Sequence, residues 1–94
     1  MTNAYNIQLD GPVLAIDDDA EYRKELEEIL TRHNLPSVFQ ETANHTLRYL
    51  QSQPWNWKPG VIITDIVMDG MGGYQLIRRI QELYPKSTIP IIVV

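Results

Sequence analysis

The sequence contains no cysteine and no long apolar run, and each absence excludes a class of protein. Without cysteine, the chain has no disulfide framework, no thiolate metal site and no cysteine nucleophile. This fits a reducing compartment, so we expect a cytoplasmic location. The apolar runs, among them residues 13–16, 61–63 and 89–94, are far shorter than the ~20 residues of a membrane-spanning helix. Residues 1–12 also lack the basic start and apolar core of a signal peptide, so we expect no membrane partner.

An excess of basic residues is missing as well. The formal net charge is −4, so we expect no nucleic-acid partner. A length of 94 residues allows one small domain, and an apolar content of 44% is enough for a core. We expect an N-terminal extension over residues 1–11 and a single domain over residues 12–94.

Short apolar runs alternate along the chain with segments of helical periodicity. The runs are continuously apolar, as is typical of strands that are covered on both faces. The resulting order, β-α-β-α-β-α-β, predicts a parallel sheet with helices on both faces. The expected strands are 12–16, 37–40, 61–64 and 89–94, and the expected helices are 20–33, 44–53 and 74–84.

The first predicted helix has two possible N-terminal caps. Asp19 is a good cap by itself, and Asp18 with Glu21 three residues later is an alternative capping box. Spacings of three and four place one set of side chains on the inward side of this helix. These side chains are Tyr22, Leu26, Ile29, Leu30 and His33.

A loop rich in proline and glycine, residues 54–60, carries two tryptophans. Large aromatic side chains beside a helix are more often part of the packing than a docking site. We therefore expect Trp55 and Trp57 to pack on the helix over residues 44–53.

Acidic residues follow two of the predicted strands. Asp17, Asp18 and Asp19 follow the first strand, and Asp65 follows the third. Ligands of such sheets bind outside the carboxyl ends of the strands. If the two strands are neighbours, Asp17, Asp18 and Asp65 lie together and repel one another, and a divalent cation such as Mg²⁺ relieves that repulsion. A single aspartate here is more often a helix cap, which is our interpretation of Asp19, but the whole pattern favours a site.

An aspartate can also attack phosphorus and form an aspartyl phosphate. Such a site needs a carboxylate nucleophile, a metal held by other carboxylates, and a mobile loop that admits the donor. Asp65, the pair Asp17 and Asp18, and the glycine-containing segment 67–73 are the candidates for these three parts.

The segments Val13–Asp19 (VLAIDDD) and Val61–Gly73 (VIITDIVMDGMGG) resemble the two signature segments of response-regulator receiver domains. Residues 89–94 resemble the fourth strand of that family, and the resemblance extends from about Pro12 to the end of the sequence. It implies a flavodoxin-like fold and a role in two-component signalling. The implied partner is a sensor histidine kinase or a phosphotransfer protein, and the implied cofactor is Mg²⁺.

The resemblance also implies a role for each matching residue. Asp65 matches the phosphoacceptor, and Asp18 matches the carboxylate that binds Mg²⁺ directly. Asp17 matches the neighbouring carboxylate, which usually acts through a metal-bound water. Val67 matches the position whose backbone carbonyl binds the metal. With Asp65 as a further ligand, these four residues form the expected metal site.

The loop near the site, Met68, Asp69 and Gly70, departs in part from the family pattern. Met68 matches a methionine with a structural role. The family usually has proline at the position of Asp69, and often Asp or Asn at the position of Gly72. We expect these two changes to speed the motion of the loop and to alter metal affinity.

The sequence also differs from the family in length. A complete receiver has five strands and five helices, and this sequence ends after the fourth strand, so the resemblance is to an incomplete receiver. The family's switch Ser or Thr and its Lys are absent from the sequence. We expect a chain of these residues alone to expose an apolar sheet face or edge and to self-associate. We also expect it to bind Mg²⁺ but to be phosphorylated poorly.

Two other functions fit parts of the sequence. A haloacid-dehalogenase-type phosphatase also has Asp-x-Asp after an apolar strand, a spacing that Asp17 and Asp19 match. Glu21, however, stands where those enzymes usually have Thr or Val. A receiver-shaped interaction fragment that does not signal needs only the fold. We therefore expect a signalling module and not an enzyme.

Overall fold

The computed structural model of the chain describes residues 9–67 and 70–94. Two residues of the predicted loop, Met68 and Asp69, lie outside the described residues, and so do residues 1–8. The strands are β1 (Val13–Ile16), β2 (Ser37–Gln40), β3 (Val61–Thr64) and β4 (Ile91–Val93), and the helices are α1 (Ala20–Arg32), α2 (Ala43–Gln51) and α3 (Gly73–Leu83).

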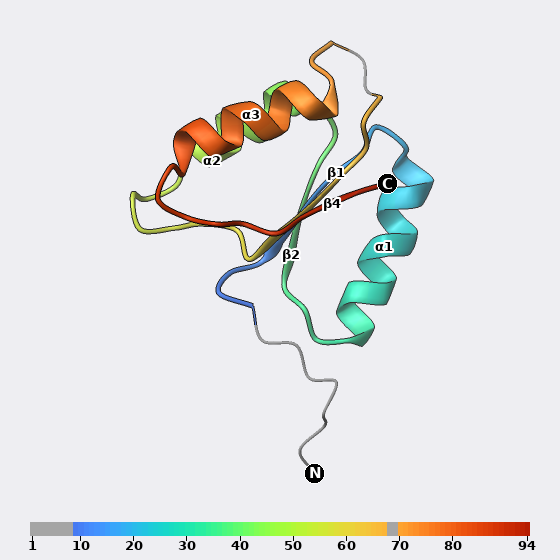
Figure 1. The fold of residues 1–94 in the computed structure, drawn as a ribbon. Helices are drawn as coiled ribbons and strands as arrows, with labels where there is room; N and C mark the ends of the chain where they lie inside the picture. Colours follow the sequence, from blue (N-terminus) through green and yellow to red (C-terminus); the bar gives the residue numbers. More distant parts are fainter. Residues whose placement is uncertain (1–8, 68–69) are drawn as a thin grey trace.

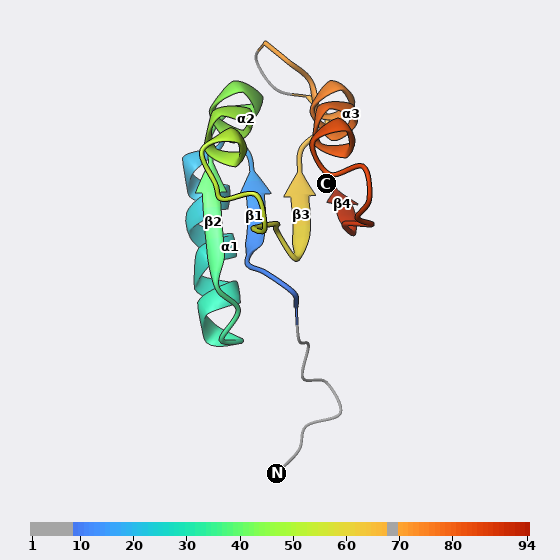
Figure 2. The ribbon, with the colours of Figure 1, turned by 90° about the vertical axis from the view of Figure 1, so that its left-hand side faces the viewer.

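The four strands form one parallel sheet in the order β2-β1-β3-β4 (Figure 2). Helix α1 lies on one face of this sheet, and α2 and α3 lie side by side on the other (Figure 1). The predicted fold class, a parallel sheet with helices on both faces, is confirmed. No helix in the described part of the chain is long and apolar enough to cross a membrane.

The starts of α1 and α2 follow from a polar side chain at the N-terminus of each helix. Asp19 Oδ1 accepts hydrogen bonds from the backbone N–H groups of Glu21 (2.9 Å) and Tyr22 (3.2 Å), so the first of the two predicted caps is correct. Thr42 Oγ1 caps α2 in the same way, accepting from the backbone N–H of His45 at 3.0 Å. Helix α1 ends where Asn34 adopts a left-handed conformation, with φ of 58°.

The main core lies between the sheet and the pair α2 and α3. Its buried side chains come from β1, β3, α2 and α3, and every one is less than a tenth exposed. They are Leu14, Ile16, Ala43, Leu47, Leu50, Ile62, Leu76 and Ile80. Side chains alternate along a strand, so Leu14, Ile16 and Ile62 point to this face and their neighbours point to the other.

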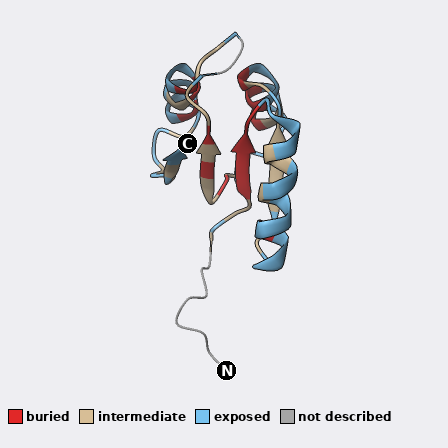
Figure 3. Cartoon of the chain, turned by 90° about the vertical axis from the view of Figure 1, so that its right-hand side faces the viewer, coloured by how far each residue is buried: buried red, intermediate tan, exposed pale blue. Residues whose placement is uncertain are grey.

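The face that carries α1 is covered only in part. Helix α1 lies over β2, next to β1 (Figure 3), and Leu30 is its buried residue. Ile29 is 47% exposed and His33 is also exposed, so the predicted inward side of this helix is wrong at these two positions. The cause is geometric: a single helix lying over the outer strand contacts the sheet along a line that is narrower than the set of apolar side chains on the helix.

Several predicted boundaries also need correction. The last strand is Ile91–Val93 and not 89–94, because Pro90 has no N–H to donate and contributes only its carbonyl, which accepts from Ile62 N at 2.9 Å. The first strand begins at Val13, one residue later than predicted. The second and third helices each begin and end one or two residues before the predicted limits.

The two tryptophans of the loop after α2 behave differently. The Trp57 ring packs edge-to-face on Tyr49 of α2, with ring centroids 5.6 Å apart, as predicted. Trp55 is 95% exposed, so its predicted packing on α2 is wrong. The Trp57 amide donates to the Pro54 carbonyl at 3.0 Å and closes a turn, and Trp55 projects outward from the tip of that turn.

Candidate metal centre at the carboxyl edge of the sheet

Strands β1 and β3 are neighbours, and the direction of winding reverses between them. β1 connects outward to β2 through α1, whereas β3 connects to β4 on the other side through α3. Ligand sites of open α/β sheets lie at such a reversal, beyond the carboxyl ends of the strands. The register pairs Ile16 with Thr64, so the next residue on each strand, Asp17 or Asp65, emerges at the same edge.

Three of the acids expected from the sequence come together there. Carboxylate oxygens of Asp17, Asp18 and Asp65 all lie within 4.8 Å of one another, and we call this set the acidic cluster. It borders an open pocket of about 340 Å³. The lining of this acidic pocket is Asp17, Asp18, Asp19, Tyr22, Asp65 and Val94.

The members of the acidic cluster differ in their surroundings. Asp17 is 8% exposed, and its Oδ1 accepts a hydrogen bond from the backbone N–H of Asp19 at 2.8 Å. Asp18 is exposed, and Asp65 is intermediate. The Asp65 backbone N–H donates to the Ile16 carbonyl at 3.3 Å, which extends the β1–β3 ladder into the cluster and fixes the position of Asp65.

Burial raises the pKa of the Asp17 carboxyl above its ordinary value of 3.8. The negative charges of Asp65, Asp18 and Asp19 raise this pKa further, in that order, and the hydrogen bond from the Asp19 backbone N–H opposes the rise. The ionised form of Asp17 is therefore disfavoured when the acidic cluster stands alone. A bound cation would remove that penalty.

The donor set of the acidic cluster fits a hard divalent cation. Mg²⁺ takes oxygen ligands at about 2.1 Å, so two ligands of one ion lie at most about 4.2 Å apart. The carboxylate oxygens here lie within 4.8 Å, and a small rotation of a side chain brings them to that spacing. The described residues supply only oxygen at this place, which favours Mg²⁺ over the metals that prefer nitrogen or sulfur.

Asp19 has a structural task. Its Oδ1 accepts from two backbone N–H groups of the first turn of α1, at 2.9 and 3.2 Å. The alternative function of a haloacid-dehalogenase-type phosphatase, which rests on Asp17 and Asp19, requires that the Asp19 carboxyl is free to transfer a proton. A carboxylate held as a helix cap is a poor match for that task, because protonation would weaken the cap.

The segment after β3 lies close against α3. Val67 is 79% exposed, and its backbone N–H donates to Asp65 Oδ1 at 3.3 Å. Gly73 N donates to the Ile66 carbonyl at 2.8 Å, and a Cβ at Gly73 would collide with the Asp65 carbonyl oxygen. Gly70 has φ of 79°, a conformation that favours glycine. The role of the Val67 carbonyl as a metal ligand stays a prediction.

Three residues at the site were not singled out from the sequence. Tyr22 and Val94 line the acidic pocket, and the Arg23 Nη1 group donates to the Asp17 backbone carbonyl. Tyr22 and Arg23 lie in the first turn of α1, and Val94 directly follows β4 at the same edge of the sheet, but their residue types gave no signal of a site. The hydrogen bond from Arg23 links the turn after β1 to α1, next to the acidic cluster.

Comparison with known proteins agrees with this geometry. The family model described as the response regulator receiver domain matches residues 13–94. The chain is 37% identical over 83 residues to the DNA-binding transcriptional regulator NtrC of Proteus hauseri, covering 88% of this chain and 16% of that protein. It is 32% identical over 89 residues to the two-component response regulator ARR5 of Arabidopsis thaliana, covering 86% of this chain and 48% of that protein. The chain thus spans less than half the length of these relatives.

Solved structures show the same fold. A response regulator receiver protein from Pseudomonas putida superposes with a TM-score of 0.73 at 32% identity, covering 94% of this chain and 69% of that one. The architecture is thus the flavodoxin-like receiver fold, here with four strands and three helices among the described residues. From the family match, the sequence similarity and the shared fold, we conclude that this chain belongs to the response regulator receiver domain family.

Proposed function

We propose that this chain is a phosphoacceptor module of two-component signalling, in which Asp65 accepts a phosphoryl group. The observation that carries the proposal is the acidic cluster, whose carboxylates lie within 4.8 Å of one another at the reversal point of the sheet. Receiver domains are signalling modules, and the family match over residues 13–94 supports this class of function. The receiver unit is residues 12–94, and residues 1–11 are an extension to it.

In this proposal the acids divide the work. Asp17, Asp18 and Asp65 would hold Mg²⁺ with the Val67 carbonyl, and the ion would supply positive charge that offsets the negative charge of the transferring group. A carboxylate oxygen of Asp65 forms the new P–O bond while the P–N bond of a phosphohistidine donor breaks, and the imidazole leaves. Asp65 is partly exposed and borders the open acidic pocket, so a donor can reach it from solvent.

The donor is a sensor histidine kinase or a phosphotransfer protein of the cytoplasm, as the similarity to two-component response regulators supports. A second association involves the chain itself. The α1 face of β3 and β4 carries Ile92 and Val94, which are 50% and 53% exposed, and β4 is the outer strand of the described sheet. We propose that the 94-residue chain alone self-associates through this surface.

Intact-mass spectrometry tests the proposed acceptor. The protein is incubated with acetyl phosphate and Mg²⁺, and we expect a phosphoryl adduct on only a minor fraction of the parent chain, because a chain of these residues alone is expected to be phosphorylated poorly. The adduct should be absent in Asp65→Asn and present in Asp10→Asn, which removes an exposed carboxylate from residues ahead of β1. An adduct that persists in Asp65→Asn would assign the chemistry to another residue. If neither the parent nor Asp10→Asn, which both keep the acidic cluster, forms an adduct, the chain is a receiver-shaped binding module and not a phosphoacceptor.

A further inference from the structure

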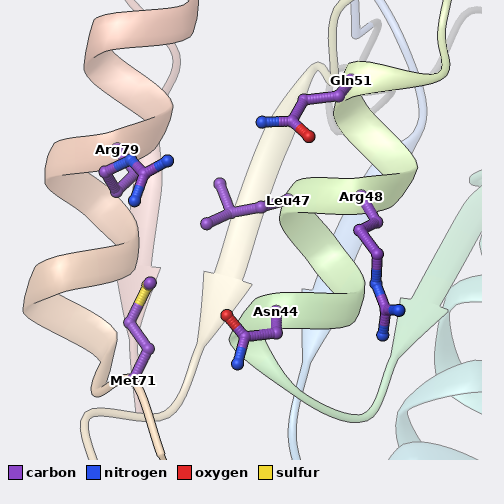
Figure 4. Close-up of a pocket in the computed structure, with 6 residues that line it drawn as sticks. All are labelled: Asn44, Leu47, Arg48, Gln51, Met71 and Arg79. Atoms are coloured by element: carbon purple, nitrogen blue, oxygen red, sulfur yellow. The ribbon is translucent and has the colours of Figure 1, made fainter.

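The face of the protein formed by α2 and α3 has a groove that the phosphoacceptor chemistry does not use. The α2–α3 groove encloses about 450 Å³ between the two helices (Figure 4). Its lining is Asn44, Leu47, Arg48, Gln51, Met71 and Arg79. It lies on the sheet face opposite α1, where the described chain has no further layer.

The side chains in Figure 4 give the groove a definite chemistry. The amides of Asn44 and Gln51 and the side chain of Leu47 extend from α2 toward α3, and the Arg79 guanidinium extends from α3 toward α2. Arg48 extends away from α3 and adds only positive potential. The floor is therefore apolar, with a cation on one wall and two amides on the other.

The cation of the groove is open to exchange. Arg79 Nε lies 3.7 Å from Glu82 Oε1, and the two side chains are 51% and 67% exposed. An ion pair between exposed side chains contributes little, because water and salt screen it. A carboxylate brought in by a partner can therefore join or replace Glu82 at a small cost, and a bidentate contact with the guanidinium would be stronger.

An apolar hollow continues the groove at its Gln51 end, near the C-terminal ends of α2 and α3. This second pocket, of about 260 Å³, shares Gln51 with the first and is bordered by Leu50, Leu83, Tyr84 and Trp55. Trp55 is 95% exposed and stands at the rim. A fully solvated tryptophan beside an apolar hollow is unusual in a protein without a partner, and tryptophan is among the residues most enriched at the centres of interfaces.

We propose that the α2–α3 groove and its apolar hollow bind an extended peptide segment of another protein, which carries an acidic and an apolar side chain. The carboxylate pairs with Arg79, and the apolar side chain enters the hollow between Leu83 and Trp55. Asn44 and Gln51 offer donors and acceptors to the peptide backbone, whose N–H and C=O groups are free in an extended chain and occupied in a helix.

The spacing of the anchors fixes the spacing in the peptide. Arg79 and Leu83 are four residues apart on α3, which is about 6 Å along the helix. An extended chain advances about 3.3 Å per residue, and residues two apart point to the same side. The acidic and the apolar residue are therefore separated by one residue in the partner.

Selection from an unbiased library tests both the chemistry and the spacing. Random 12-residue peptides displayed on phage are selected on the immobilised protein and counter-selected on the Trp55→Ala, Arg79→Glu double variant. We expect enriched sequences that share an acidic residue next but one to an apolar residue. A library that yields no sequences specific for the parent, or a basic consensus, would overturn the proposal.

Affinity measurements on an enriched peptide locate its site. We expect Arg79→Glu and Trp55→Ala each to weaken binding by about tenfold or more. Their matched controls are Arg78→Glu, the same charge reversal one residue away outside the groove lining, and Asn56→Ala on the same loop, each with less than about a twofold effect. Equal losses in Arg79→Glu and Arg78→Glu would reduce the effect to net charge and contradict the proposed contact.

The emission of Trp55 reports its burial, and sedimentation then distinguishes a peptide from a second copy of the chain. In a Trp57→Phe background, peptide binding should shift the Trp55 emission to shorter wavelength, because the indole leaves water. Sedimentation without peptide then compares the parent with Trp55→Ala. Self-association that Trp55→Ala abolishes would make a second copy the occupant and overturn the peptide assignment.

Discussion

On one face of the sheet, α2 and α3 pack side by side and bury Leu14, Ile16 and Ile62 almost completely. On the other face, α1 alone covers the β2 side (Figure 3), and Ile92 and Val94 of the β4 side stay half exposed. The strand residues that point to the two faces are similarly apolar, and on the α1 face Val13 and Ala15 of the central strand β1 are each only 2% exposed. The difference therefore comes from what packs on each strand and from the position of β4 at the edge of the described sheet. An apolar run in the sequence therefore shows that a strand can be buried, but whether its side chains are buried depends on the elements that pack against it.

The largest difference should appear in the core. Ile62→Ala removes a side chain that is fully buried under α2 and α3, and we expect a loss of about 2–5 kcal/mol in the free energy of unfolding. The same substitution at Ile92, which is 50% exposed, should cost less than about 1 kcal/mol. Urea unfolding of both variants measures the contrast. Similar losses would mean that the two faces are equally covered in solution.

The second largest effect on stability should come from the close backbone contact between α3 and the end of β3, beside the acidic cluster. The first residue of α3, Gly73, has no room for a Cβ, because the Asp65 carbonyl oxygen occupies that position. We expect Gly73→Ala to cost about 1–3 kcal/mol in the free energy of unfolding. Gly72→Ala is the control, since its Cβ would lie 3.4 Å from the Ile66 carbonyl oxygen, an ordinary contact. Equal stability of the two variants would show that α3 is not pressed against the strand end.

The acidic cluster should respond in opposite senses with and without metal. Asp17→Asn removes a charge whose ionisation burial disfavours, so we expect the metal-free protein to melt at a higher temperature. Because the pKa of Asp17 is raised in the fold, its ionisation destabilises the metal-free protein as the pH rises above 3.8 through the raised pKa. The same variant should lose roughly 10- to 100-fold in Mg²⁺ affinity. Calorimetric titration and melting curves, with Asp10→Asn as the control, test both signs.

The smallest effect concerns association through the half-covered face. We expect Ile92→Lys to raise the dissociation constant of self-association by about tenfold, because it places a charge on the exposed β4 side. Leu83→Lys makes the same change on α3, at a residue that is 40% exposed on the opposite face, and should have little effect. Sedimentation of both variants over a range of concentrations measures the difference. A larger effect of Leu83→Lys would place the contact on the α2–α3 face.

Much of the fold could be predicted from local patterns. The order of elements and the parallel sheet follow from apolar runs and helical periodicity, and the Asp19 cap follows from residue type. The limits of the last strand could not, because Pro90 takes part in the ladder through its carbonyl alone. Ile29 and Trp55 are residue types that are common in cores, and only the three-dimensional arrangement shows that both side chains are exposed.

The candidate site could be predicted in its acids but not in its neighbours. Proximity of Asp17 and Asp65 follows once β1 and β3 are taken to be adjacent, and strand order is the one assumption required. Arg23 gave no signal, because its hydrogen bond to the Asp17 carbonyl depends on the path of the turn before α1. Tyr22 was expected on the inward side of its helix, and its place in the wall of the acidic pocket depends on where that helix begins.

The alignment of Asp17 with Asp65 is decided at the far end of the sheet. Gly60 N donates to the Pro12 carbonyl at 2.9 Å. The two backbones are so close there that a Cβ at Gly11 would collide with the Lys58 carbonyl oxygen, and a Cβ at Gly60 would collide with the Gly11 carbonyl oxygen. This contact starts β1 and β3 in register, Val13 beside Val61, about 13 Å before the acids. A slip of one residue would move one carboxylate by about 3.3 Å and turn it to the opposite face. Two small residues without any reactive group therefore determine whether a cation can be shared at the other end.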